Sequence, residues 1–481
     1  MLRIPRVMIA AMRSGSGKTL LTMGFLRLLN QKIQGLHAYK CGPDYIDPMF
    51  HTKVLGIESR NLDPYFCDKA DLNRILSKQK TGYALMEGVM GLYDGIAADT
   101  TAGSSYEVAV HTGTPVILIA DASKVGRTII SQIKGILLDD KDRMIRGLIL
   151  NRISEQFYEK LKPVLIKELA EAGFPDVKCL GGIPFLKGIE IDSRHLGLKM
   201  PDEIRNINEQ IDKVAGVVDK YVDMAAVLDI MSTASDISTY NSSDISSEYI
   251  SNQSIAIARD EAFCFLYSDN LEIFKERGIG IKYFSPLYDK EIPAGVSALL
   301  LPGGYPELYL KELSSNEDML RSIRNAINSG IPSLAECGGF MYLHRLVRDE
   351  KGVAYPLVGV IDGECTYTGH LVRFGYMCIE SVYPENAGTD HFPEYIKLLS
   401  GMKGHEFHYY DSTSNGSSAV AVKPYYSSFI SEKNGNRNRW NCMVAGNNGL
   451  WGFPHFYYRS APAFIYAFVQ AMEEYAHGQF K

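Results

Sequence analysis

The sequence lacks closely spaced cysteines and long apolar runs. Its eight cysteines are scattered along 481 residues without a C-x-x-C pair, so they predict neither a disulfide framework nor a zinc site. No apolar run reaches the roughly eighteen residues that a membrane-spanning helix needs. The opening MLRIPR leads straight into an apolar segment and shows no signal-peptide cleavage region. We therefore expect a soluble, cytoplasmic protein.

An excess of positive charge is also absent. Lys and Arg together number 50 against 56 Asp and Glu, which gives a formal net charge of -6. This balance favours neither nucleic acid nor an anionic membrane as a partner, so an anionic substrate must find local positive charge. Hydrophobic residues make up 46% and charged residues 22%, as in ordinary globular proteins. The length predicts about two to four domains.

The first motif is a glycine-rich turn between two apolar segments. The first apolar segment is residues 7–11, the turn is Gly15–Thr19, and the second apolar segment is the leucine-rich stretch Leu20–Leu29. Strand, turn and helix in this order are the context of a phosphate-binding loop. We expect the backbone at Gly15 and Gly17 to cradle phosphate oxygens. Lys18 would hold the β and γ phosphates of ATP or GTP, and Thr19 would ligate Mg²⁺. Met12 replaces the first consensus glycine, which leaves a simple strand–turn–helix corner as the alternative.

Apolar strands and helical segments alternate through the first half. The candidate strands are Gly35–Lys40, Tyr83–Glu87, Pro115–Ala122, Leu148–Asn151 and Cys179–Pro184. This alternation predicts an α/β fold with a parallel sheet covered on both faces. Ligands of such sheets bind at the carboxyl ends of the strands.

Two acidic motifs follow predicted strands. KCGPDYIDP carries Asp44 and Asp47 between two prolines, and EGVMGLYDG carries Glu87 and Asp94. The first pair can face a metal ion or a nucleophile, or it can form a turn, since Asp and Pro are common turn residues. An acidic residue at a strand end completes the Mg²⁺ shell of P-loop proteins. A surface loop with incidental carboxylates is the alternative for the second motif.

Two further strand ends leave more than one interpretation open. Asp121 and Ser123 lie in ADASKVGRT, which could hold phosphate or a substrate carboxylate, or could cap the next helix. Asn151 closes the strand in LILNR and could hydrogen-bond a base edge. The pattern alone decides neither case.

A polar linker divides the chain. Residues 232–254 are mostly Ser, Thr, Asn and Asp, and little in them could offset the entropy of ordering. The predicted domains are therefore residues 1–231 and 255–481. A passive tether is a simpler role for the linker than regulatory phosphorylation.

The second half begins again with an apolar strand and carries two glycine-containing loops. Its candidate strands begin at Ile255 and continue at Gly280–Phe284, Val296–Leu301 and Ile331–Ala335. In LPGGYPE, Gly303 and Gly304 free backbone N–H groups to face an oxyanion, although a simple glycine turn is the alternative. In SLAECGGFMYL, a strand, Cys337, two glycines and an apolar helix form a nucleophile elbow, whose helix N-terminus favours thiolate. A lone cysteine can also be a small buried hydrophobe.

A nucleophilic cysteine needs a base, and four of the histidines downstream of Cys337 are candidates. They are His370, His405, His408 and His455. The motif GHEFHY around His405 and His408 alternates as a strand does, so a structural role, substrate contact and metal binding all remain open. Attack of the cysteine on a glutamine side-chain amide would give a thioester and free NH₃.

Several motifs together resemble cobyrinic acid a,c-diamide synthases. They are KCGPDYIDPMFH, SRNLDPYF, EGVMGLYDG, GLILNR and SRHLGL, in this order along the chain. That family uses ATP and glutamine to amidate two carboxylates of a corrin precursor of cobalamin. The resemblance implies an N-terminal P-loop synthetase domain, similar to dethiobiotin synthetase, and a C-terminal flavodoxin-like glutamine amidotransferase domain. The loop of that family often lacks the first glycine, so Met12 is compatible with the resemblance.

The resemblance also implies roles for individual residues. Lys18 and Thr19 bind ATP and metal, and Asn151 contacts the adenine. The acidic residues around Mg²⁺ and the reacting carboxylate are Asp44, Asp47, Glu87 and Asp94, with Thr19, Asp44 and Glu87 as metal ligands. The candidates for binding the corrinoid polycarboxylate are Tyr45, Arg60, Arg194 and His195, although the basic ones could instead pair with nearby aspartates.

The resemblance selects His455 as the base, because class I amidotransferases have a late histidine after the cysteine elbow. The usual triad adds an acidic residue two positions after the histidine. Tyr457 stands there, so a Cys337–His455 dyad is the prediction.

Three other interpretations remain. Cobyric acid synthase has similar domains, and the substrate could be hydrogenobyrinic acid or nickel-sirohydrochlorin. A partitioning-type nucleotide switch shares the P-loop but has no use for Cys337. The protein could also be an oligomer.

Overall fold

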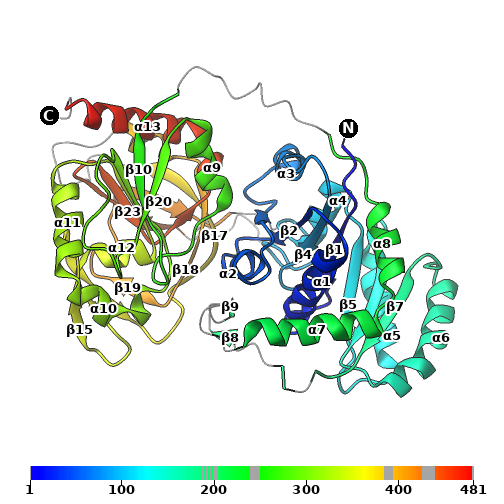
Figure 1. Cartoon of the computed structure of the whole chain (residues 1–481). Coiled ribbons are helices and arrows are strands. Elements are labelled where there is room, and N and C mark those ends of the chain that lie inside the picture. The colour runs from blue at the N-terminus through cyan, green and yellow to red at the C-terminus, as the bar shows by residue number, and fades with distance from the viewer. Residues whose placement is uncertain are drawn as a thin grey trace, which may run out of the picture. The chain divides into compact units, whose positions relative to one another are not determined.

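The computed structural model describes residues 2–186, 188–189, 193–194, 197–198, 204, 206–238, 250–383, 394–424 and 439–478. The chain forms two compact units that divide near residue 242 (Figure 1). This division agrees with a boundary in the predicted linker region, while the limits 1–231, 232–254 and 255–481 stay predictions.

The first unit is built on a seven-stranded sheet of order β3-β2-β4-β1-β5-β6-β7, in which all neighbouring strands pair in parallel. The strands are β1 (Arg6–Ala11), β2 (Leu36–Cys41), β3 (Ser59–Leu62), β4 (Tyr83–Glu87), β5 (Val116–Asp121), β6 (Ile145–Asn151) and β7 (Lys178–Ile183). The predicted parallel α/β fold is confirmed. Every residue of β1 and β5 is buried, as expected for central strands covered on both faces.

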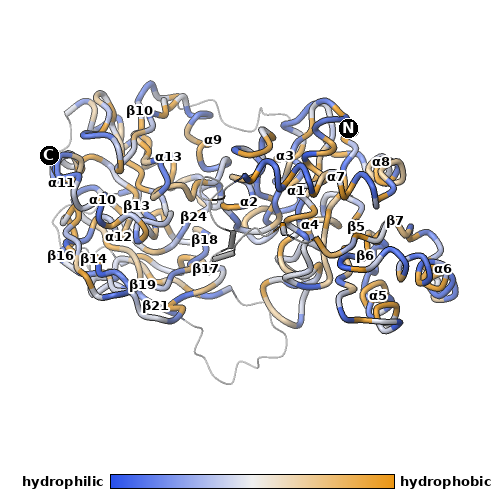
Figure 2. Tube along the Cα trace, turned by 60° about the horizontal axis from the view of Figure 1, so that its bottom comes forward, coloured by the Kyte–Doolittle hydropathy of each residue, from blue (hydrophilic) through white to orange (hydrophobic). Residues whose placement is uncertain are grey.

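The helices of this unit connect the strands. They are α1 (Lys18–Lys32), α2 (Ile46–Met49), α3 (Lys69–Ser77), α4 (Ser105–Thr112), α5 (Thr128–Asp139), α6 (Glu155–Glu171), α7 (Ile207–Tyr221) and α8 (Met224–Ser232), with a π-helical turn at Phe50–Val54 and a short ribbon β8 (Ser193–Arg194) and β9 (Gly197–Leu198). Figure 2 shows hydrophilic and hydrophobic residues alternating along α6, which is typical of a helix with one buried face. Helix α7 lies along α1, where a Cβ on Gly24 would be only 2.6 Å from Cγ1 of Val214.

The second unit contains one mainly parallel sheet and two smaller sheets. The central sheet has the order β11-β10-β12-β13-β23-β22, with only β22 antiparallel. Its strands are β10 (Ser254–Ala258), β11 (Gly280–Phe284), β12 (Ala298–Leu301), β13 (Ser333–Glu336), β22 (Val444–Gly446) and β23 (Gly449–Gly452). The four strands predicted from apolar runs are all present.

The smaller sheets were not predicted. Their orders are β15-β14-β16-β19 and β21-β20-β17-β18-β24. The strands are β14 (His344–Arg348), β15 (Ala354–Pro356), β16 (Ile361–Tyr367), β17 (Arg373–Val382), β18 (Lys403–His408), β19 (Tyr410–Ser412), β20 (Ala419–Val422), β21 (Arg439–Cys442) and β24 (His455–Phe456). Strand β18 confirms that GHEFHY is extended.

Helices and two separate apolar clusters cover the central sheet of the second unit. The helices are α9 (Ser268–Glu276), α10 (Leu310–Ser315), α11 (Glu317–Asn328), α12 (Gly338–Leu343) and α13 (Pro462–Ala476). Ile255 and Ile257 of β10 belong to one cluster, whereas Ala256 and Ala258 belong to the other. Successive strand residues point to opposite faces, so the sheet is buried on both sides. Among the helices that the structure describes, none is long and apolar enough to cross a membrane.

Candidate functional site

The loop from Gly15 to Thr19 has the backbone that a phosphate cradle requires. Gly15 has φ 77° and Gly17 has φ 83°, in the left-handed region that favours glycine. A Cβ on Gly17 would lie 2.5 Å from Nδ2 of Asn151. That amide donates to the carbonyl of Ser16 at 2.8 Å. Asn151, at the end of β6, therefore fixes the loop in the structure.

Lys18 is held by the loop that follows β4. Its Nζ donates to the carbonyl of Met90 at 2.9 Å, and Met90 has a positive φ of 48°. Burial, and then the nearby charge of Lys40, lower the pKa of Lys18 to about 8. An anion placed beside this ammonium would relieve both effects, which suits a phosphate ligand.

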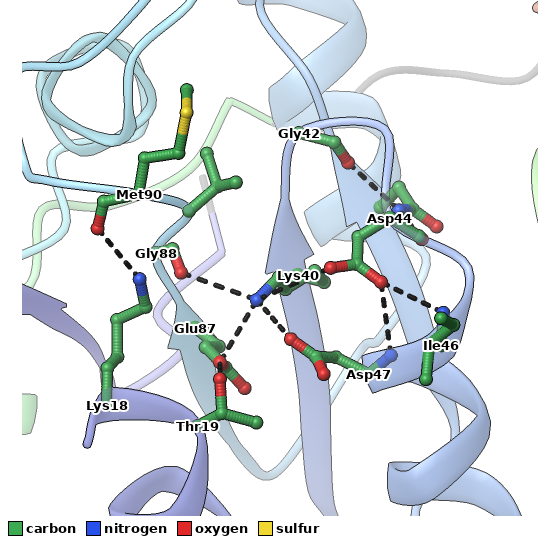
Figure 3. Close-up of polar contacts among 12 residues, drawn as sticks. Lys18, Thr19, Lys40, Gly42, Asp44, Ile46, Asp47, Glu87, Gly88 and Met90 are labelled. Atoms are coloured by element: carbon green, nitrogen blue, oxygen red, sulfur yellow. Dashed lines mark hydrogen bonds and ion pairs between the residues drawn. The ribbon is translucent and has the colours of Figure 1, made fainter. Parts of the chain in front are cut away.

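Lys40 of β2 lies at the centre of a buried ionic cluster (Figure 3). Its Nζ contacts the carboxylate of Asp47, lies 3.0 Å from Oε1 of Glu87, and is 3.8 Å from Oδ2 of Asp44. The side chain of Lys40 is only 3% exposed. The sequence analysis selected the three carboxylates but missed Lys40, because a lysine at a strand end carries no signal of its own. It completes the cluster.

The cluster shifts the pKa values of its two buried acids, Glu87 and Asp47, in opposite directions. Burial alone would raise the pKa of Glu87, but the charges of Lys40, His51 and Lys18 outweigh it and hold that pKa well below its ordinary value. Burial and the charges of Asp44 and Glu87 raise the pKa of Asp47 despite its contact with Lys40. The negative charges of Asp47, Glu87 and Asp44 outweigh burial and raise the pKa of Lys40. Lys40 therefore stays charged, with Glu87 as its ionised partner.

Thr19 and Glu87 form the pair best suited to a metal ion. The hydroxyl of Thr19 donates to Oε1 of Glu87 at 2.6 Å. Oε2 of the buried Glu87 has no hydrogen-bond partner among the described residues and lies 3.5 Å from Nε2 of His51. Mg²⁺ is commonly bound by one or two carboxylates together with phosphates. The donors present therefore fit a P-loop Mg²⁺ site.

His51 is a second residue that the sequence analysis missed. It belongs to the π-helical turn, is fully buried, and its Nδ1 lies 2.9 Å from Oγ of Ser59. Isolated π-turns are frequent at functional sites. His51 is therefore a buried neighbour of the Glu87 carboxylate.

Asp44 has a structural role in the described state. Its Oδ1 accepts hydrogen bonds from the backbone N–H groups of Ile46 at 2.9 Å and Asp47 at 3.1 Å (Figure 3). Asp44 thus orders the start of α2, while its Oδ2 faces Lys40. The half-buried Tyr45 directly follows Asp44.

The remaining predicted residues of the first unit lie in varied places. Asp94 is exposed and accepts from the N–H of Gly91 at 2.8 Å, within the loop after β4. Arg60 of β3 pairs with Glu58 at 2.6 Å, which is a glutamate and not one of the aspartates that the alternative interpretation named. The side chain of Arg194 and the whole of His195 lie outside the described residues.

Asp121 does not cap helix α5. Its Oδ2 is 3.0 Å from Nη1 of Arg152 and 3.3 Å from Nη2 of Arg13, and its Oδ1 accepts from the N–H of Ser123 at 3.0 Å. Helix α5 begins later, with Arg127 as its N-cap. Asp121 therefore joins the phosphate-loop side of the sheet to the end of β6.

In the second unit, Cys337 occupies the predicted elbow. It follows β13, precedes α12 and has φ 47° and ψ -104°, a backbone conformation that non-glycine residues rarely adopt. Its N–H donates to the carbonyl of Gly452 at 2.8 Å. A sharp, constrained turn of this kind is typical of a catalytic nucleophile.

Two glycine positions bring the other predicted elements to the elbow. A Cβ on Gly338 would lie 3.1 Å from the amide nitrogen of Gly304, and a Cβ on Gly303 would lie 2.2 Å from Cε1 of His455. The loop of Gly303 and Gly304 therefore contacts both the turn after Cys337 and the ring of His455.

The site favours the neutral forms of the cysteine and the histidine, whereas the sequence analysis expected the helix N-terminus to favour thiolate. Burial, followed by the charges of Glu307 and Glu406, raises the pKa of Cys337. Burial, followed by His405 and His408, lowers the pKa of His455 well below its ordinary value. A neutral imidazole can accept the thiol proton as the cysteine attacks.

Tyr457 and the GHEFHY strand contribute buried polar contacts. The hydroxyl of Tyr457 donates to Oδ2 of Asp269 at 3.2 Å. His408 lies 3.1 Å from Oε2 of Glu406 and stacks on Phe453 with ring centroids 3.9 Å apart. No group of three or more His, Cys, Asp or Glu side chains in the described part of the chain could hold a metal ion, so metal binding by His405 and His408 receives no support.

Comparisons with known proteins agree with this two-part organisation. Residues 7–198 match the CobQ/CobB/MinD/ParA nucleotide binding domain, and residues 254–450 match the CobB/CobQ-like glutamine amidotransferase domain. The chain thus belongs to the class of proteins that join a nucleotide-binding domain to a glutamine amidotransferase domain.

Curated relatives identify the family. The chain is 36% identical to a cobyrinate a,c-diamide synthase of Caldanaerobacter subterraneus over 93% of this chain and 94% of the relative. It is 36% identical to one of Clostridium tetani over 96% and 99%, and 35% identical to one of Picrophilus torridus over 98% and 99%. The chain belongs to the cobyrinate a,c-diamide synthase family and is an enzyme of the glutamine-dependent ligase class. The recognised family and the enzyme class are therefore confirmed.

Proposed function

We propose that the protein amidates the a and c side-chain carboxylates of cobyrinic acid, a step of cobalamin biosynthesis, with ATP as the energy source and glutamine as the nitrogen source. One observation carries the proposal. A phosphate loop beside a Lys40-centred carboxylate cluster occurs in the same chain as a sharp Cys337 elbow, which the loop of Gly303 and Gly304 connects to His455. The names of the relatives support the choice of substrate.

The first unit would activate the acid. A substrate carboxylate attacks the γ-phosphorus of ATP and releases ADP, which leaves a carboxyl phosphate. Lys18 and Lys40 are the buried cations that can offset the charge developing on the phosphoryl oxygens. Thr19 and Glu87 would hold Mg²⁺, with Asp44 as the further ligand that the family resemblance implies, and the ion would supply positive charge to the phosphates. Asp47, bound to Lys40, holds that lysine in place.

The second unit would supply ammonia. The thiol of Cys337 attacks the side-chain amide carbon of glutamine while His455 accepts the thiol proton and passes it to the leaving nitrogen. The products are a glutamyl thioester and NH₃, and water then releases glutamate from the cysteine. Backbone N–H groups at Gly303 and Gly304 would stabilise the oxyanion of each tetrahedral intermediate.

Ammonia then joins the two half-reactions. It attacks the carbonyl carbon of the carboxyl phosphate, and inorganic phosphate leaves as the amide forms. Because ammonium is not a nucleophile, transfer of NH₃ before protonation by bulk water favours the glutamine-dependent reaction.

The decisive test uses two nitrogen sources. We expect Cys337→Ala to abolish glutamine-dependent amide formation and to retain activity with ammonium chloride at high pH. Cys365→Ala is the matched control, since Cys365 is also buried in the second unit but belongs to β16. Equal loss of both activities in Cys337→Ala, in a folded protein, would contradict the two-site mechanism.

The substrate itself needs a separate experiment. Mass spectrometry of the products formed from cobyrinic acid, hydrogenobyrinic acid and nickel-sirohydrochlorin, each with ATP and glutamine, would rank the three. We expect two successive amidations of cobyrinic acid. Amidation of one of the other tetrapyrroles, and not of cobyrinic acid, would reassign the substrate and leave the mechanism intact.

A further inference from the structure

His405 stacks on His455 in the interior of the second unit. The two residues face each other as a cross-strand pair of β18 and β24. Their ring centroids are 4.9 Å apart and their planes differ by 13°. His405 is 8% exposed and His455 is 2% exposed, so water has little access to the stack.

Each side of this stack is fixed by a close neighbour. The hydroxyl of Tyr267 lies 3.3 Å from Nδ1 of His405, which limits rotation of that ring. The backbones also approach closely, because a Cβ on Gly404 would lie only 2.5 Å from the carbonyl oxygen of His455. Gly303 meets the Cε1 edge of the His455 ring. The His455 ring is therefore enclosed by a flat aromatic partner and by backbone.

Two other polar residues near His455 make different contacts. Tyr457, two positions after His455, gives its hydroxyl to Asp269. His408 instead pairs with Glu406 and stacks on Phe453. Burial lowers the pKa of His405 to about 3, so its ring is neutral at ordinary pH.

We propose that His405 is a positioning residue of the glutaminase reaction, which holds the ring of His455 by stacking so that one ring nitrogen stays directed to the Cys337 thiol. The inference rests on the proposed function, since it assumes that His455 is the base. A flat ring restricts the tilt of its stacked neighbour, whereas an aliphatic side chain of similar size fills the space without doing so. A misplaced base slows the chemical step and leaves glutamine binding largely unchanged.

The test compares His405→Leu with His405→Phe in glutamine hydrolysis by the full-length protein. We expect His405→Leu to lower kcat by about 10- to 100-fold, with KM for glutamine changed by no more than about twofold. We expect His405→Phe, which keeps a flat ring, to stay within about fivefold of the wild-type kcat. Equal kcat values for the two variants, or a rise in KM at constant kcat, would overturn the proposal.

Two controls separate this proposal from its premises. If the wild type hydrolyses no glutamine, the proposed function fails, whereas wild-type activity with an undiminished His405→Leu variant contradicts only the positioning role. If fluorescence shows that both His405 variants are unfolded, the Tyr267→Phe variant tests the positioning role instead. It removes the hydroxyl beside His405 and no atom of the stack, and we expect a severalfold lower kcat. An unchanged kcat in that variant would contradict the proposal.

Discussion

The hydroxyl of Tyr458 donates a hydrogen bond to Oε1 of Glu336 at 2.8 Å, and both residues are buried. Glu336 directly precedes Cys337, and Tyr458 follows His455 by three residues. Asn270 of α9 strengthens the same junction, because its Nδ2 donates to the carbonyl of Phe456 at 2.7 Å and its Oδ1 accepts from the N–H of Tyr458 at 2.9 Å. The strand of the nucleophile is thereby tied to the segment of the base.

The buried Glu336 makes the stability of the second unit depend on pH. Burial raises the pKa of Glu336 from 4.5 to about 8, although hydrogen bonds from Tyr458 and the backbone of Phe456 oppose the shift. An unfolded chain releases this proton near its ordinary pKa, while the folded chain keeps it until about pH 8. The contribution of Glu336 to stability is thus complete below about pH 4.5 and is lost as the pH rises to about 8.

We therefore expect Glu336→Gln to flatten this dependence. The variant should lose less stability than the wild type between about pH 5 and about pH 8, by a difference of up to several kcal/mol. Tryptophan fluorescence during urea unfolding measures the effect, because both tryptophans, Trp440 and Trp451, belong to the second unit. Glu394→Gln is the control, since that side chain is 82% exposed. The same pH dependence in wild type and Glu336→Gln would contradict the prediction.

Gly303→Ala should stop glutamine hydrolysis. The new Cβ would lie 2.2 Å from Cε1 of His455, so the loop or the ring must move. We expect a loss of about 100-fold or more in glutamine-dependent kcat, with amidation from ammonium salts retained. Gly135→Ala in α5 is the matched control, because a Cβ there meets nothing within 4 Å. A Gly303→Ala variant with normal glutaminase kinetics would show that the loop does not constrain the base.

The sequence predicted the parts of the fold that depend on apolar runs and glycine turns. The runs at 83–87 and 280–284 became β4 and β11 within the predicted limits. The glycine turn before Lys18 and the elbow at Cys337 each have a local sequence signature. Both contain residues with positive φ in the structure. These features are encoded by neighbouring residues.

Features that depend on distant pairing were missed. The small antiparallel sheets consist of short, partly exposed strands such as β15, whose apolar pattern is weak. Lys40 and His51 gain meaning only when β2, β4 and the π-helical turn bring them to Glu87. The stacking of His405 on His455 likewise requires the pairing of β18 with β24, and no local motif predicts it.

Lys40→Met should disable the first unit. Removing the ammonium leaves the buried, ionised Glu87 without its cationic partner and Asp47 without its hydrogen-bond donor, which costs on the order of 3–5 kcal/mol. We expect loss of amidation with either nitrogen source and a lower unfolding temperature, measured by calorimetry.

Lys134→Met serves as its control, because that lysine pairs with Glu168 and has a 33% exposed side chain. Tryptophan fluorescence should report an unaltered second unit in both variants. Full ammonium-dependent activity in Lys40→Met would exclude a role for Lys40 in activating the substrate.

Asn151→Ala should weaken nucleotide binding by releasing the phosphate loop. The amide of Asn151 is the donor to the buried carbonyl of Ser16, and loss of such a bond costs about 1–3 kcal/mol, or roughly a 5- to 150-fold rise in Kd for ATP. Asn73→Ala in α3 is the control, as the Asn73 amide donates to the carbonyls of Lys69 and His111 and not to the phosphate loop. Comparison of ATP with ITP by titration calorimetry distinguishes the roles of Asn151. Loss of a loop tether weakens both nucleotides alike, which is the result we expect, whereas a loss confined to ATP would instead support the adenine contact implied by the family resemblance.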